Sequence, residues 1–160
     1  MDTNTFYSIV AGTCFTLVGL WWTVVKSRKE WIKDDQMRQL ASGVYLSFLV
    51  PGLMSLFAQV GGEVKLIWRL TFVIASLVGM IMTARLMVKT EKRLKTGLFG
   101  RNRWVVILLY GIILIFALFP TLAQPIRLQA LQVEGILLGL LILAAHGMTW
   151  EFMTVPGEGD

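Results

Sequence analysis

The sequence has very little cysteine, histidine and charge. Among 160 residues there is one cysteine, Cys14, and one histidine, His146, and only 16% of the residues are charged. A single cysteine excludes a fold held by disulfide bonds. The lack of a second histidine or a cysteine pair argues against a zinc site. Soluble domains carry about 25% charged residues, and disordered chains carry few apolar ones, so the composition excludes both classes.

Motifs for catalysis and nucleotide binding are missing as well. The chain contains no G-x-x-x-x-G-K-[ST] phosphate loop, no H-E-x-x-H and no G-x-S-x-G. An intramembrane hydrolase of the aspartyl type needs two embedded carboxylates, and Glu134 is the only acid within an apolar segment away from its ends. We therefore expect a protein that is not an enzyme and that holds no cofactor and no metal ion.

What the sequence does contain is long apolar segments. Hydrophobic residues make up 56% of the chain, and a helix needs about 20 of them to cross a hydrocarbon core roughly 30 Å thick. Five segments meet this length: 6–25, 40–60, 66–88, 104–123 and 128–150. The sequence predicts an all-α integral membrane protein with five transmembrane helices in one domain spanning 1–160. Residues 154–160 are expected to form a short flexible tail.

The basic residues indicate an orientation. Twelve of the 15 lysines and arginines lie between the first and second segments or around the connector between the third and fourth. Cytoplasmic loops are enriched in these residues, so we expect the N-terminus outside and the C-terminus in the cytoplasm of a cell inner (plasma) membrane. The net charge of +5 is explained by this topology, and we expect no nucleic-acid partner.

Small residues predict where helices pack. Close backbone contact at glycine, serine and threonine holds membrane helices together. Helix-packing candidates of the first segment share one stripe: Ser8, Gly12, Thr16, Gly19 and Thr23. Those of the fifth segment are Gly135, Gly139 and Gly147. His146 lies on the same face as these glycines, where it either forms a hydrogen bond between helices or carries protons.

Polar residues within the second segment are candidates for a conduction pathway. Ser47, Pro51, Ser55 and Gln59 recur every four residues. A proline cannot donate to the carbonyl of residue 47, so it favours a bend there. The freed carbonyl and its polar neighbours either line a water-filled path or form hydrogen bonds to adjacent helices in a kinked helix.

The third segment adds a second set of pathway candidates. Arg69, Ser76 and Thr83 lie on one stripe. Arg69 and Glu134 have similar predicted depths near the outer ends of their helices, and intramembrane charges usually pair. We hypothesise an Arg69–Glu134 ion pair, acting either as a gate or as a structural clamp. Arg69 snorkelling to the surface is the alternative.

Two functions remain open at this level. The first is an oligomeric ion channel or small-solute transporter, with the pathway candidates lining its path. The second is a non-catalytic accessory or scaffold subunit of a larger membrane complex. The expected partners are the lipid bilayer and either further copies of the chain or a larger membrane complex. The basic mouth favours anions and Glu134 favours cations, so the charge of the permeant species is undetermined.

Overall fold

The computed structural model of the chain describes residues 2–61, 64–89 and 104–154. Within these ranges all regular structure is helical. The elements are α1 (Thr3–Ser27), α2 (Lys29–Lys33), α3 (Asp35–Val60), α4 (Lys65–Lys89), α6 (Trp104–Leu118), the 3-10 helix η1 (Pro120–Ile126) and α7 (Ala130–Thr154). The predicted tail lies outside the described residues apart from Thr154, and so does most of the basic connector between α4 and α6.

Four helices are long and apolar enough to cross a membrane: Thr3–Ser27, Asp35–Val60, Lys65–Val88 and Ala130–Met153. By their length and composition, these four segments indicate a multi-pass membrane protein. α6 is shorter, because its 15 residues extend only about 22 Å. The number of helices that cross the membrane is therefore four or five.

The prediction of a helix over 104–123 is wrong at its C-terminal end. α6 stops at Leu118, and Phe119 leaves the helical conformation with φ −123° and ψ 69°. Phe119 precedes Pro120, and the proline ring disfavours the α conformation for the residue before it. The chain continues as η1 and turns at Arg127, whose φ of 56° is left-handed. α1, α3 and α4 extend beyond their predicted bounds by one to five residues at one or both ends, and α7 begins two residues later and ends four residues later than predicted.

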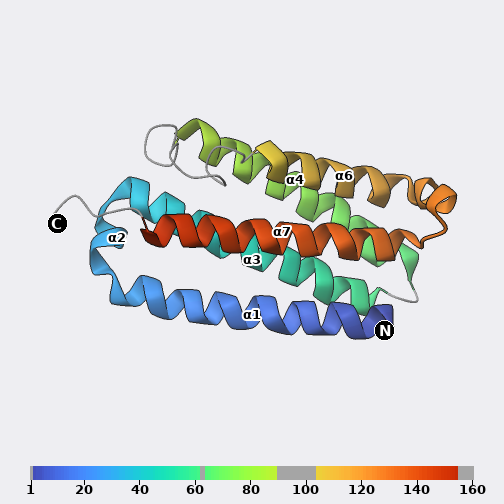
Figure 1. Ribbon diagram of the computed structural model, residues 1–160, viewed down its shortest axis with the longest axis horizontal. Coiled ribbons are helices and arrows are strands. Elements are labelled where there is room, and N and C mark those ends of the chain that lie inside the picture. The colour runs from blue at the N-terminus through green and yellow to red at the C-terminus, as the bar shows by residue number, and fades with distance from the viewer. Residues whose placement is uncertain (1, 62–63, 90–103, 155–160) are drawn as a thin grey trace.

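Successive long helices alternate in direction along one bundle, so α1 begins at one end of the molecule and α7 ends at the other (Figure 1). We call these the α2 end and the η1 end. α1 packs on α3, α4 packs on α3 and α6, and α7 packs on α3 and α6. Half of the apolar window of α3 is buried, against 17% in α1 and in α4. α3 is therefore the central helix.

The α2 end is organised by a helix cap and an aromatic cluster. The Asp34 side chain accepts hydrogen bonds from the backbone N–H groups of Gln36 and Met37, at 2.8 and 3.3 Å, which starts α3 at the next residue. Trp21 is buried and its ring lies 5.9 Å from that of Phe152 in α7. These contacts hold the ends of α1, α3 and α7 together at one end of the bundle.

Candidate functional site

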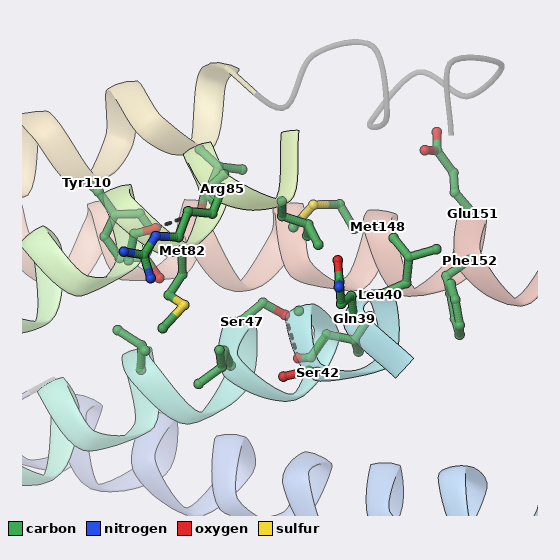
Figure 2. A pocket seen from close by; sticks show the side chains of 18 of the residues that line it. Gln39, Leu40, Ser42, Ser47, Met82, Arg85, Tyr110, Met148, Glu151 and Phe152 are labelled. Carbon is green, nitrogen blue, oxygen red and sulfur yellow. Dashed lines mark hydrogen bonds between the residues drawn. The ribbon is translucent and has the colours of Figure 1, made fainter. Parts of the chain in front are cut away.

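A cavity of about 510 Å³ lies among α3, α4, α6 and α7 toward the α2 end. We call it the four-helix cavity, and Figure 2 shows the residues around it. Its walls are mainly aliphatic and include Leu40, Val44, Val50, Leu86 and Val106. The polar residues that line it come from three helices: Arg38, Gln39, Ser42 and Ser47 from α3, Thr83 and Arg85 from α4, and Glu151 from α7. Tyr110 of α6 also lines it.

Two glycines make room for the walls of this cavity. A Cβ atom at Gly79 would overlap the ring of Tyr110, which is only 4% exposed. Glycine at this position thus lets the tyrosine ring lie directly against the backbone of α4. Across the cavity, a Cβ atom at Gly43 would come within 2.8 Å of Leu86 Cδ2. Both contacts draw α4 close to its neighbours and fix the shape of the cavity.

The hydroxyl groups in the cavity are oriented by their own helices. Ser47 donates to the carbonyl of Val44 at 2.7 Å, and Thr83 donates to the carbonyl of Gly79 at 2.7 Å. Each hydroxyl proton is used in its helix, so the remaining lone pairs of these oxygens act as acceptors. The middle of the cavity therefore has weak acceptors on otherwise apolar walls.

Three charged side chains, Arg38, Arg85 and Glu151, line the cavity. Arg38 forms an ion pair with Asp35 at 2.7 Å and is largely exposed. Figure 2 shows Arg85 extending from α4 toward the side of the cavity where Tyr110 lies, with Glu151 at the opposite side. Two guanidinium groups and one carboxylate line the cavity, and Arg38 is already paired with Asp35. An apolar interior with a few polar groups, at this volume, is typical of a small-molecule site.

The structure does not bring the predicted pathway residues together. Only Ser47 and Thr83 line the four-helix cavity. The buried members of the set are Pro51, Ser55, Ser76 and Glu134. Pro51 lies within a continuous α3. Gln59 and Ser76 donate hydrogen bonds to carbonyls of their own helices. Within one protomer these residues therefore do not line a common cavity, and their part in a pathway through an oligomer stays a prediction.

The predicted Arg69–Glu134 ion pair is also wrong. The Arg69 guanidinium donates to the carbonyls of Ala117 and Leu118, from Nε at 2.9 Å and from a terminal nitrogen at 2.8 Å. These are the last carbonyls of α6, which have no partner within their helix. Glu134 is 0% exposed, and neither of its carboxylate oxygens has a hydrogen-bond partner. A helix end with free acceptors competes effectively for an arginine.

The small-residue stripe of α1 does not pack within the protomer. All five of its residues are exposed: Ser8, Gly12, Thr16, Gly19 and Thr23. The buried face of α1 carries Tyr7, Ala11, Cys14 and Trp21 instead. Large side chains fill the space between α1 and its neighbours, and the stripe lies on the opposite face. In the described part of the chain nothing approaches a Cβ atom built at Gly12 or Gly19 within 4 Å.

Only part of the predicted packing face of α7 is packed within the protomer. A Cβ atom at Gly135 would lie 2.9 Å from the Phe6 ring and 3.6 Å from the hydroxyl of Tyr7, which itself donates to the carbonyl of Leu131 at 2.6 Å. Gly135 therefore gives α1 close access to α7. Gly139 is exposed and Gly147 is half-buried.

His146 does not connect two helices by a hydrogen bond. Its ring is exposed, and Nδ1 lies 2.9 Å from the carbonyl oxygen of Ile142, one turn earlier in α7. The ring also lies edge-on to Phe48 of α3, with 5.2 Å between centroids. The contacts of His146 are therefore a hydrogen bond within its own helix and an aromatic contact with α3.

Sequence reasoning missed Tyr110, Arg38, Arg85 and Glu151 as members of a site. From the sequence, the two arginines indicate only topology, and Tyr110 lies in a uniformly apolar segment. A signal was present in Gly43 and Gly79, since glycine inside a membrane helix often marks a close approach. Their partners depend on how four helices are arranged, which the sequence pattern does not encode.

Among the described residues, no group of three or more histidine, cysteine or acidic side chains is placed to hold a metal ion. The four-helix cavity is thus defined by shape, guanidinium groups and hydroxyls. No protein-family model, no curated protein and no solved structure matches this chain.

Proposed function

We propose that the protein is a small-solute transporter of the inner (plasma) membrane that takes up amphiphilic anions in the four-helix cavity. The single observation that carries this proposal is the cavity of about 510 Å³, with aliphatic walls and with Arg38 and Arg85 in its lining. An alkyl or aryl body would displace water from the walls, and an anionic group would remain at the guanidinium groups. A homo-oligomer with its N-terminus outside is the expected assembly.

An ion channel is less well supported than a solute transporter. A channel needs polar groups that replace the hydration shell of an ion along a continuous path. Ser76 and Gln59 donate instead to carbonyls of their own helices. Aliphatic side chains form most of the cavity wall, which suits a partly apolar solute.

The exposed small-residue stripe of α1 favours a second candidate, the accessory or scaffold subunit. Gly12 and Gly19 offer a close-packing surface that no other described helix of the protomer uses. In this function the stripe contacts another membrane protein, and the four-helix cavity transports nothing. The two candidates differ in whether purified protein alone moves a solute.

We expect purified protein in sealed liposomes to take up octyl phosphate, whose phosphate is charged at pH 7. Octyltrimethylammonium, with the same chain and the opposite charge, should not be taken up. Ser47→Leu fills the cavity with aliphatic atoms and should abolish uptake. Arg85→Gln removes a charge-assisted hydrogen bond and should weaken octyl phosphate binding about tenfold. Uptake of the radiolabelled octyl compounds measures transport of the solute. Imposed gradients of K⁺, Na⁺, H⁺ and Cl⁻ measure ion flux through the same protein.

Thr71→Leu is the matched control for Ser47→Leu. Thr71 of α4 does not line the four-helix cavity, and like Ser47 it donates to a carbonyl of its own helix, that of Ile67 at 2.9 Å. This variant should transport as the unmodified protein does. Equal uptake of both octyl compounds would contradict an anion site. Absence of all flux, together with a partner that co-purifies in fixed ratio, would favour the accessory subunit.

A further inference from the structure

A second cavity, of about 220 Å³, lies where α1, α2 and α3 meet. We call it the aromatic cavity, because Trp21, Trp22, Trp31 and Tyr45 line it. The indole N–H of Trp21 donates to the carbonyl of Ala41 at 2.9 Å, which fixes the orientation of that ring. The rings of Trp22 and Tyr45 meet edge to face with 6.1 Å between centroids. The rings come from three elements and form a built site.

Aromatic faces carry partial negative charge and attract cations. One cation already lies against this cluster, since the guanidinium carbon of Arg28 is 5.8 Å from the centroid of the Trp31 ring. Several rings around one cavity are the arrangement that recognises quaternary ammonium groups in other proteins. The cavity walls therefore suit the cationic part of a ligand.

The same cavity includes a guanidinium group. Arg38 lines it, and its ion pair with Asp35 uses one nitrogen of a group that has five N–H donors. Guanidinium groups bind phosphate with paired hydrogen bonds. A ligand that satisfies both features carries a phosphate next to an ammonium group.

The size and position of the aromatic cavity identify the source of such a ligand. Its 220 Å³ is smaller than the 300–1,000 Å³ typical of sites that enclose a whole small molecule. A headgroup fits and acyl chains do not. Trp22 is 63% exposed and Ile32 48% exposed at its rim, which leaves an apolar surface outside the cavity for acyl chains. Tryptophan and tyrosine at helix ends also mark the membrane interface.

The geometry points to a binding site for the phosphate-ammonium headgroup of a zwitterionic phospholipid, with the ammonium among the rings of Trp22, Trp31 and Tyr45 and the phosphate on Arg38. The aromatic cavity lies on the α1 and α2 side of α3 and shares only Arg38 and Ser42 with the four-helix cavity. This inference does not depend on the proposed transport function.

The test titrates the full-length protein, in maltoside micelles, with phosphatidylcholine, phosphatidylethanolamine and phosphatidylglycerol of identical acyl chains. Native mass spectrometry counts the lipids that remain bound. We expect the two ammonium lipids to bind about tenfold more tightly than phosphatidylglycerol, which has the phosphate and no ammonium. Equal binding of all three lipids would overturn the proposal.

Variants separate the two halves of the headgroup site. Tyr45→Leu and Trp31→Leu should remove the preference for ammonium lipids, whereas Trp31→Phe keeps an aromatic face and should preserve it. Arg38→Gln should weaken the binding of all three lipids by the same factor. Trp104→Leu is the matched control, because Trp104 is an exposed tryptophan of α6 outside the aromatic cavity. If Trp104→Leu reduces the preference as much as Tyr45→Leu does, the aromatic cavity is not the site.

Discussion

At the scale of single residues, the least expected feature is a carboxyl group buried without a partner. Glu134 and Ser55 are both 0% exposed, and neither has a hydrogen-bond partner for its side-chain oxygens. Leaving buried polar groups unsatisfied costs about 1–3 kcal/mol each, and more for a charged group. Glu134 therefore lowers the stability of the single protomer and does not connect two of its helices by a hydrogen bond.

This predicts that Glu134→Leu stabilises the protein. The free energy of unfolding should rise by about 1–3 kcal/mol, because leucine fills similar space and removes unsatisfied oxygens. Denaturant titration of the purified protein in detergent measures the change. Ser76→Ala is the contrasting control, since Ser76 is buried and donates to the carbonyl of Phe72, so stability should not increase. A less stable Glu134→Leu protein would show that the carboxyl group has a partner in the assembled state.

At the scale of elements, α6 is the unusual helix. Its 15 residues are fewer than a membrane-spanning helix needs, and Pro120 prevents it from continuing. Its last carbonyls are satisfied from another helix, by Arg69 of α4. α6 and α4 are therefore connected at two levels, by this cap at the η1 end and by the Gly79–Tyr110 contact nearer the α2 end.

We predict that Arg69→Met loosens the C-terminal turn of α6. Hydrogen bonds from charged groups contribute about 1.5–3 kcal/mol, so the variant should unfold at lower denaturant and show faster amide hydrogen exchange near Leu118. Arg69→Lys should recover only part of the loss, because an ammonium lacks the guanidinium fork. Lys65→Gln, an exposed change at the start of the same helix, should have no effect. Unchanged amide exchange near Leu118 in the Arg69→Met protein would disprove the cap.

At the scale of the whole molecule, the topology follows from the alternating direction of successive helices. The described helices run up and down along one bundle, with α2 and the end of α7 at one end and η1 at the other (Figure 1). Positions 33 and 153 thus belong to the α2 end, and positions 64 and 127 to the η1 end. From the distribution of basic residues we predict that the α2 end faces the cytoplasm.

Single cysteines introduced at these four positions test that orientation. In a Cys14→Ala background, which removes the only native cysteine, a membrane-impermeant thiol reagent added to intact cells should label positions 64 and 127. Positions 33 and 153 should react only after the membrane is opened. Labelling of all four from outside would contradict the alternating topology, and labelling of 33 and 153 alone would reverse the orientation.

The sequence by itself determined the helical class, the long apolar segments and their approximate bounds. These follow from local chemistry, because a backbone in hydrocarbon must satisfy its own hydrogen bonds and 20 apolar residues make a span. Even the error at α6 has a local cause, since Pro120 is visible in the sequence. Ser47 and Thr83 can also be predicted as candidate site residues from the sequence, because they are polar residues inside apolar helices.

Only the tertiary structure decided which faces meet. Helical periodicity groups Ser8 to Thr23 on one stripe but does not say what lies opposite, and α1 in fact buries its large side chains. Depth along a segment placed Arg69 near Glu134, yet the carbonyls at the end of α6 were closer acceptors. The four-helix cavity and the aromatic cavity each combine residues from three or more elements. Such sites depend on rotation and spacing of whole helices, which contacts between distant parts of the chain set.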